Sequence, residues 1–159
     1  MLFFNKYSSE FFIYKRLGIL KNLCVALCKK NGRANTGRLI LYGRGGGFKR
    51  FYRLIDFKRF IIDIPARIIK FEYDPNRNIY IMLLLYYNGV LTYNLAPMLV
   101  KVNMYLLDYN FAYIRPGVAL SIVNAFIGSF ISCVKLNSGK FKYARSAGAF
   151  IQLVRKFGD

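Results

Sequence analysis

Residues 31–59 read NGRANTGRLILYGRGGGFKRFYRLIDFKR. This stretch places three consecutive glycines, Gly45 to Gly47, inside a segment dense in Arg and Lys. Glycine marks positions where the backbone turns sharply or approaches another group closely. Because the neighbouring side chains are cationic, this pattern predicts a backbone that lies very close to a negatively charged partner.

The charge of the whole chain points to the same kind of partner. Lys and Arg number 25 against 7 Asp and Glu, which gives a net charge of +18 in 159 residues. From Lys29 to Arg59, ten basic residues oppose only Asp56, so half of the excess lies in this segment. A charge of this size repels itself in a compact monomer unless a polyanion neutralises it. Nucleic acid and an anionic membrane are the two candidates.

The absence of His removes many catalytic and metal-binding arrangements. The chain has no His, which removes Ser-His-Asp and Cys-His arrangements and His-ligated metals, and its three Cys are too few for a four-cysteine zinc site. Gly47 is followed by Phe48 and Lys49, so the glycine run is not a nucleotide-hydrolase phosphate loop. Glu72 and Asp74 lie close to basic residues and are expected to form a neutralised surface patch. We therefore expect no catalytic activity, no metal and no cofactor.

Two uncharged stretches, residues 78–100 and 116–134, could form membrane-spanning helices. Asn88-Gly89 divides the first stretch between two β-prone runs, which is the strongest short hairpin signal. Pro97 would also interrupt a span. We expect strands and no membrane, and a small basic membrane protein with two spans remains the alternative.

Hydrophobic periodicity predicts mainly short strands. One short helix is expected within residues 20–27, which would place Cys24 and Cys28 one turn apart. Strands are expected at 38–42, 49–57 and 64–74, followed by a turn at 74–78. In the strand at 64–74, strict alternation puts Ala66, Ile68, Lys70 and Glu72 on one face.

Strands at this spacing predict an all-β protein built from small barrels. The expected organisation is a basic N-terminal extension (residues 1–32), a barrel (33–105) and the start of a second β-unit (106–159). Residues 115–117 would open the second unit, and residues 137–140 would form a turn in it. The extension could be an import presequence or a tail that crosses RNA.

Four stretches carry a resemblance to a known family: GRANTGRLILYGRGGGFKRFYRLIDFKR, IPARIIKFEYDPNRNIYIMLLLYYNGVLTYNLAP, IRPGVAL and ARSAGAFIQLV. In this order and with this spacing they resemble the bacterial-type large-subunit ribosomal protein family L-two, over residues 27–155. The resemblance implies an OB-like barrel followed by an SH3-like barrel, both docked on large-subunit rRNA beside other large-subunit proteins. It also implies a scaffolding role.

The resemblance further implies which residues contact rRNA. In the glycine-rich segment they are Arg33, Asn35, Arg38, Arg44, Gly45, Gly46, Gly47, Lys49, Arg50 and Arg53. Lys58, Arg59 and Arg77 would extend this footprint, and Arg145 and Ser146 would form a second contact loop. Where the family usually has His, this chain has Gly43 and Phe48, and we expect Phe48 to stack on a base or a ribose instead.

The family continues beyond the length of this chain, so the SH3-like barrel is expected to be incomplete. We expect a second polypeptide to carry the missing C-terminal half and to complete that barrel in trans. The abundance of Phe and Tyr fits an AT-rich organellar genome, which favours the mitochondrion, with a plastid-type organelle as the alternative. A free OB module that binds single-stranded RNA is the remaining alternative function.

Overall fold

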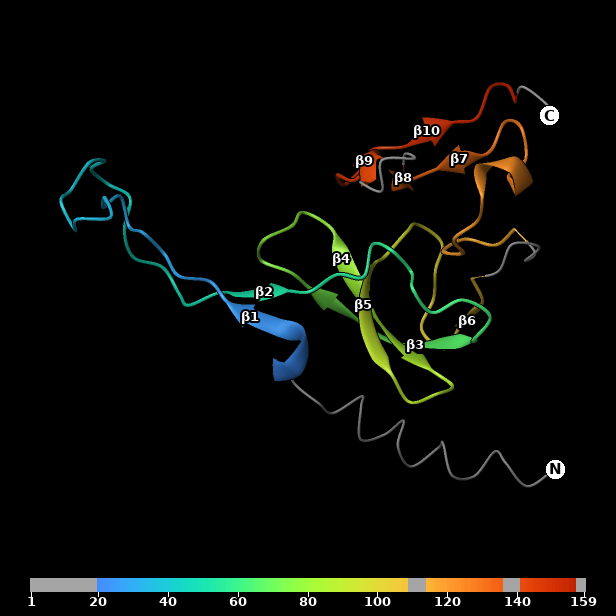
Figure 1. The fold of residues 1–159 in the computed structure, drawn as a ribbon, viewed down its shortest axis with the longest axis horizontal. Helices are drawn as coiled ribbons and strands as arrows, with labels where there is room; N and C mark the ends of the chain where they lie inside the picture. The colour runs from blue at the N-terminus through green and yellow to red at the C-terminus, as the bar shows by residue number, and fades with distance from the viewer. Residues whose placement is uncertain (1–19, 109–113, 136–140, 157–159) are drawn as a thin grey trace.

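The protein is described by a computed structural model for residues 20–108, 114–135 and 141–156 (Figure 1). Within these residues the regular structure consists of short β-strands and two single-turn 3-10 helices, η1 (Lys21–Leu23) and η2 (Ile122–Asn124). The all-β prediction is therefore confirmed. Residues 1–19 of the expected N-terminal extension and the turn expected at 137–140 lie outside the described residues.

A four-stranded antiparallel sheet forms the centre of the molecule, with strand order β5-β4-β3-β6. Its strands are β3 (Ala66–Tyr73), β4 (Tyr80–Tyr86), β5 (Leu91–Leu95) and β6 (Tyr105–Leu106). The sheet curls on itself into an OB-like half-barrel (Figure 1), as the sequence predicts.

The hairpin between β4 and β5 forms where the sequence places it. Gly89 has φ 83°, a conformation that glycine adopts without strain. The backbone N–H of Tyr86 donates to the carbonyl of Val90 at 3.0 Å, and Asn88 accepts from the N–H of Val90 at 3.1 Å through its side chain. Residues 78–100 thus form two strands, and no helix among the described residues is long and apolar enough to span a membrane.

A β-bulge in β3 corrects the predicted alternation. The pairing with β4 shifts between Ile68 and Lys70, so Ile69 is an extra residue. Residues that follow Ile69 therefore lie on the face opposite to the one that strict alternation predicts. Phe71 joins Ala66 and Ile68 on one face, whereas Lys70 and Glu72 lie on the other.

The two faces of the sheet contribute to two separate apolar clusters. The first contains the buried residues Ala66, Ile68, Met82, Leu84, Tyr86 and Leu106. The second contains Ile69, Ile81, Leu83 and Tyr93, with Leu20 and Leu23 packed against it. The sheet is thus covered on both faces, which explains why β4 reads as a nearly continuous apolar run that resembles a membrane span.

The prediction of a helix within residues 20–27 is wrong beyond the first turn. After η1, the chain extends as β1 (Cys24–Ala26), which pairs antiparallel with β2 (Phe51–Arg53). Pairing with β2 outweighs the weak local helix preference of this stretch. Cys24 therefore lies on a strand, opposite Arg53.

The strand expected at 38–42 is also absent. Residue Leu39 makes one isolated bridge with Arg33, and the N–H groups of Ile40 and Leu41 both donate to the carbonyl of Gly32, at 2.9 and 3.1 Å. The segment therefore folds back on a local turn and has no neighbouring strand with which to form a ladder. A Cβ on Gly32 would lie 2.3 Å from the carbonyl oxygen of Leu41, so this turn requires glycine.

The remaining strands form two small antiparallel pairs beyond the half-barrel (Figure 1). These pairs are β7 (Phe130–Ile131) with β10 (Ile151–Gln152), and β8 (Val134–Lys135) with β9 (Phe141–Tyr143). Cys133, with φ 54°, separates β7 from β8. The SH3-like assignment of this unit and the predicted domain boundaries stay predictions.

Candidate nucleic-acid interface

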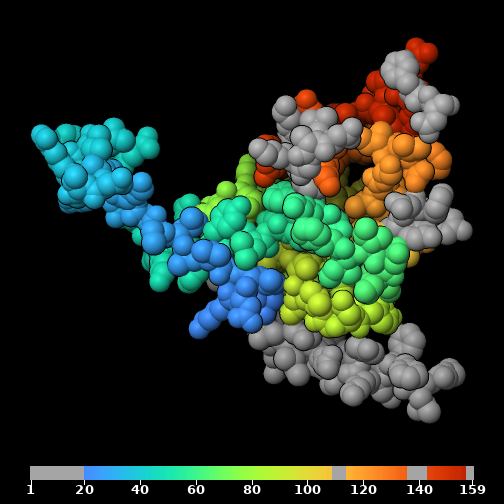
Figure 2. All heavy atoms as spheres, viewed as in Figure 1, coloured from blue at the N-terminus to red at the C-terminus, as the bar shows by residue number. Residues whose placement is uncertain are grey.

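Residues 27–50, which we call the arm, leave the half-barrel between β1 and β2 and extend well away from it (Figures 1 and 2). At its base, the N–H of Leu27 donates to the carbonyl of Arg50 at 3.3 Å, which continues the β1–β2 pairing. Farther out, the N–H of Ala34 donates to the carbonyl of Arg38 at 2.8 Å. None of residues 27–50 is buried, so the arm has no core of its own.

The glycine run lies in the returning half of the arm. Gly46 and Gly47 both have φ 74°, a left-handed conformation that other residues adopt only with strain. The Lys29 ammonium donates to the carbonyl of Gly46 at 3.0 Å, so the run is tied to the outgoing half of the arm. A Cβ on Gly45 or Gly46 would meet open space, which leaves this backbone accessible from outside.

The arm carries only positive charge. Its seven basic residues are Lys29, Lys30, Arg33, Arg38, Arg44, Lys49 and Arg50, and it contains no Asp or Glu. All seven are exposed. Besides the Lys29 contact, Arg33 donates to the carbonyl of Gly37 at 3.0 Å, Arg50 donates to that of Pro75 at 3.2 Å, and the Lys49 ammonium lies 5.7 Å from the centre of the Phe51 ring. The arm therefore presents an unneutralised cationic surface.

Two aromatic rings stand out on this surface. Phe48 is 94% exposed and Tyr42 is 86% exposed, and they flank the segment Gly43–Gly47. Phe48 was expected to contact a ligand, whereas sequence reasoning missed Tyr42. The signal that could have found Tyr42 is its position between an apolar run and a glycine in a segment without acidic residues.

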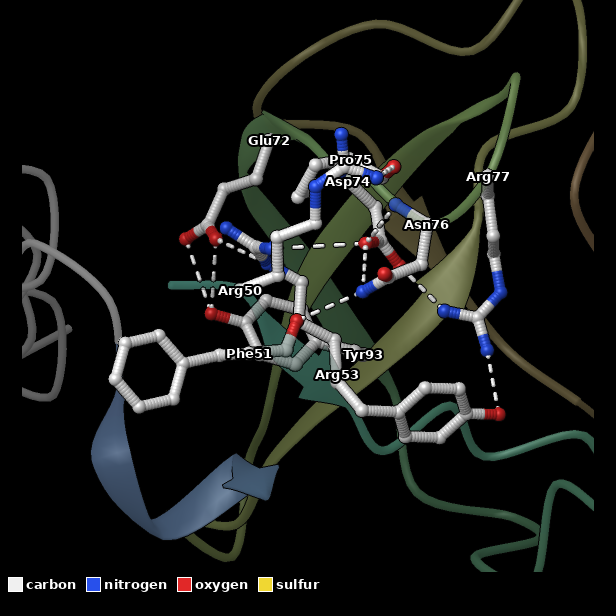
Figure 3. Close-up of polar contacts among 10 residues, drawn as sticks. Arg50, Phe51, Arg53, Glu72, Asp74, Pro75, Asn76, Arg77 and Tyr93 are labelled. Carbon is white, nitrogen blue, oxygen red and sulfur yellow. Dashed lines mark hydrogen bonds and ion pairs between the residues drawn. The ribbon is translucent and has the colours of Figure 1, made fainter. Parts of the chain in front are cut away.

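Arg53, at the base of the arm, is buried, with only 6% of its surface exposed. Its side chain points toward the carboxylates of β3 and the turn after it (Figure 3). Its guanidinium forms ion pairs at 3.6 Å with Glu72 from β3 and with Asp74 just after it. Asp74 is fully buried and the Glu72 side chain is 12% exposed, so the carboxylates are neutralised as expected but do not form a surface patch. A buried charge without partners is very costly, which is why the three groups occur together.

The turn after β3 completes this buried network. Asp74 forms an ion pair with Arg77, and Arg77 donates to the Tyr52 hydroxyl at 2.8 Å. Asn76 donates to the carbonyl of Phe51 at 2.8 Å and to Asp74 at 3.2 Å (Figure 3). The turn thereby holds β2, and with it the base of the arm, against the half-barrel.

Tyr93 joins the same network from β5. Its hydroxyl donates to both oxygens of Glu72, at 3.1 and 3.0 Å, and the Lys70 ammonium lies 2.8 Å from the same carboxylate. Burial, followed by the negative charge of Glu72 and this hydrogen bond, raises the pKa of Tyr93 far above its usual value. Burial also raises the pKa of the thiol of Cys24, on the neighbouring β1.

Arg59, another residue of the expected footprint, also makes internal contacts. Its guanidinium donates to Asp108 at 2.9 Å and to the carbonyl of Gly117 at 3.1 Å. Asp108 accepts in addition from the N–H of Ala119 at 2.8 Å. Arg59 therefore connects the loop after β2 to the chain segment that leads into the second unit.

The second expected contact loop lies near the loop that contains Lys58. Arg145 is exposed and its guanidinium lies 4.7 Å from the centre of the Phe57 ring. Lys58 is exposed as well, and Ser146 is exposed beside Arg145. The structure thus divides the predicted contact residues into three groups: the exposed arm, the arginines paired with carboxylates of the same chain, and a smaller exposed group on the body around Phe57.

The described residues contain no group of three or more His, Cys, Asp or Glu side chains arranged to hold a metal ion. A cationic arm with an open glycine backbone and exposed rings is the arrangement expected of a nucleic-acid interface, in which basic residues contact phosphates and aromatic rings contact bases.

Comparison with known proteins identifies the family. The family described as Ribosomal Proteins L2, RNA binding N-terminal domain, matches residues 20–107, more than half of the chain. The chain belongs to this family. The matched range includes the whole arm and the central sheet, so the L2 resemblance seen in the sequence is confirmed.

Individual L2 relatives extend the match past the central sheet. Large ribosomal subunit protein uL2 of Methylococcus capsulatus is 46% identical over 132 residues, which are 82% of this chain and 48% of that protein. The uL2 proteins of Endomicrobium trichonymphae and Rhodospirillum rubrum are 45% and 44% identical over 87% and 86% of this chain, and over 51% and 50% of their own length. The chain spans about half the length of these L2 relatives.

Proposed function

We propose that this protein is a structural, non-catalytic constituent of the large ribosomal subunit that binds large-subunit rRNA and supports translation. The observation that carries this proposal is the arm, which has seven basic residues, no acidic residue and no core. The uL2 names of the relatives support the ribosomal assignment. The matching family description supports RNA as the ligand.

Within the predicted footprint we assign two roles. The exposed residues contact RNA: Arg33, Asn35, Arg38, Arg44, Gly45, Gly46, Gly47, Phe48, Lys49, Arg50, Lys58, Arg145 and Ser146. Arg53, Arg59 and Arg77 position these residues, because their guanidinium groups are paired with carboxylates of the same chain. Other large-subunit proteins would lie beside the body of the molecule.

The salt dependence of RNA binding tests the role of the arm. Each neutralised phosphate releases counterions, with a log–log slope of about −0.7 per contact on single strands and −0.9 on duplex. If about six cations contact phosphates, the slope is about −4 to −5. A slope flatter than about −1 for the folded chain would contradict the proposal. Sedimentation of the tagged chain away from large subunits would favour the free single-stranded-RNA module instead.

We also propose that a second polypeptide, equivalent to the other half of the relatives, packs on the second unit. The proposal is supported by largely exposed apolar side chains around β7 and β10: Phe130 and Phe150, whose rings contact each other, are 68% and 66% exposed, and Val154 is 78% exposed. Such exposed apolar strand edges invite pairing with another strand. Mass spectrometry of purified large subunits tests this, since one polypeptide that contained both halves would contradict it.

We propose the mitochondrial ribosome as the location, with a plastid-type organelle as the alternative. The proposal is supported by composition alone, namely 15 Phe and 13 Tyr with no Trp and no His. Co-sedimentation with ribosomes from fractionated organelles tests it. Recovery only from cytosolic ribosomes would contradict it.

A further inference from the structure

Charge explains why the arm attracts RNA, but it does not explain the two most exposed rings on it. Phe48 is 94% exposed and Tyr42 is 86% exposed, in a segment without any buried residue. Single exposed aromatics on a folded surface are common, but these two belong to the arm, which projects away from the half-barrel (Figure 2). They pack on nothing within the arm that would stabilise it.

The conformation of the arm holds both rings outside. Gly43, Gly46 and Gly47 have φ between 70° and 74°, so the backbone between the two rings turns repeatedly. A Cβ on Gly43, Gly45 or Gly46 would meet nothing within 4 Å, and one on Gly47 would meet the Lys29 ammonium at 3.2 Å, so most of this stretch is open. The rings therefore flank an open stretch of backbone that is surrounded by cations.

A ligand that fits this surface must be anionic and must also offer flat apolar faces. Continuous RNA duplex meets only the first requirement, because its bases already stack on one another and expose only their edges in the grooves. Unpaired bases meet both requirements, since their faces are free and every base has a face that can stack on an aromatic ring.

We propose that Tyr42 and Phe48 stack on unpaired bases, so that the arm selects looped or single-stranded segments of RNA over continuous duplex; this inference rests on the proposed function. The cations of the arm hold the backbone on either side of the stacked bases. The two rings are thus residues that determine specificity, whereas Lys49 and Arg44 contribute affinity for any RNA.

The test measures the affinity of the full chain for two fluorescein-labelled RNAs, a single strand of about 12 nucleotides and a duplex of the same length, by fluorescence anisotropy. The variants are Tyr42→Leu, Phe48→Leu and the double variant, which keep apolar bulk but lose the ring. Tyr80→Leu is the matched control, because Tyr80 is 62% exposed on β4 and lies outside the arm. Circular dichroism verifies that each variant is folded.

We expect each arm variant to weaken single-strand binding by between about fivefold and 150-fold, the effect of losing one stacked base. Duplex binding should change by less than about twofold, since the phosphate contacts remain. Tyr80→Leu should change neither. Irradiation with 5-iodouridine RNA should crosslink Tyr42 or Phe48, as read by peptide mass spectrometry.

Two results would overturn the inference and leave the proposed function standing: salt-sensitive binding that the arm variants do not change, or an equal loss on single strand and duplex. Absence of salt-sensitive binding to either RNA would overturn the proposed function and this inference with it.

Discussion

Replacing Asp74 with Asn should destabilise the half-barrel strongly, although the side chain keeps its shape. Asp74 is fully buried, and its carboxylate pairs with both Arg53 and Arg77. Removing one partner of a buried ion pair costs about 3–5 kcal/mol, because the other charge stays buried without compensation. Arg53 keeps Glu72 at 3.6 Å, so we expect a loss near the lower limit, about 3 kcal/mol.

Urea unfolding followed by far-UV circular dichroism measures this loss. With a slope of about 1–2 kcal/mol per molar urea, the midpoint should fall by about 1.5–3 M. Asp63→Asn is the matched control, because it makes the same change in net charge at an exposed carboxylate and should cost less than about 0.5 kcal/mol. Equal midpoints for the two variants would refute the role of Asp74 as the counter-charge of Arg53.

Three further predictions concern the arm, the tyrosine in the network and the thiols. Gly46→Val should reduce incorporation into large subunits far more than Lys58→Ala, because valine is strained at φ 74° whereas Lys58 is one cation among many; equal incorporation would mean that the glycine conformation is unimportant. Because the pKa of Tyr93 is raised in the folded chain, its contribution to stability is complete below about pH 10 and is lost as the pH rises further. Between pH 8 and 11, the urea midpoint of Tyr93→Phe should therefore fall less than that of the parent chain. Iodoacetamide should modify exposed Cys28 before Cys24 and Cys133, since burial raises the pKa of the latter two thiols. Peptide mass spectrometry measures the order of modification, and the reverse order would contradict this prediction.

The sequence predicted the features that depend on local chemistry. Asn88-Gly89 predicts the hairpin because the backbone of the turn needs glycine there, and the clustering of Arg and Lys marks the arm whatever its conformation. The strand expected at 38–42 failed because alternation alone does not provide a neighbouring strand. The turn on Gly32 takes up the N–H groups of Ile40 and Leu41 instead.

The candidate site was predictable in outline and less so in detail. Composition marks every Arg between 33 and 59 as a candidate contact, but it cannot distinguish exposed Arg44 from buried Arg53. That distinction depends on Glu72 and Asp74, which approach Arg53 only after β2 and β3 have folded together. Charges far apart in the chain therefore decide which cations remain available to a ligand.

The bulge in β3 determines where the fold can tolerate the deletion of a single residue from this strand. Loss of the codon for Ile69 would remove the extra residue and leave every other pairing with β4 as it is, at the expense of one buried side chain. Loss of the codon for Phe71 would instead leave the bulge in place and shift the later residues by one position, which turns them to the opposite face. Glu72 would then face the first apolar cluster, away from Arg53 and Tyr93. Tolerated one-residue deletions within this strand should therefore be confined to the bulge, residues 68–70.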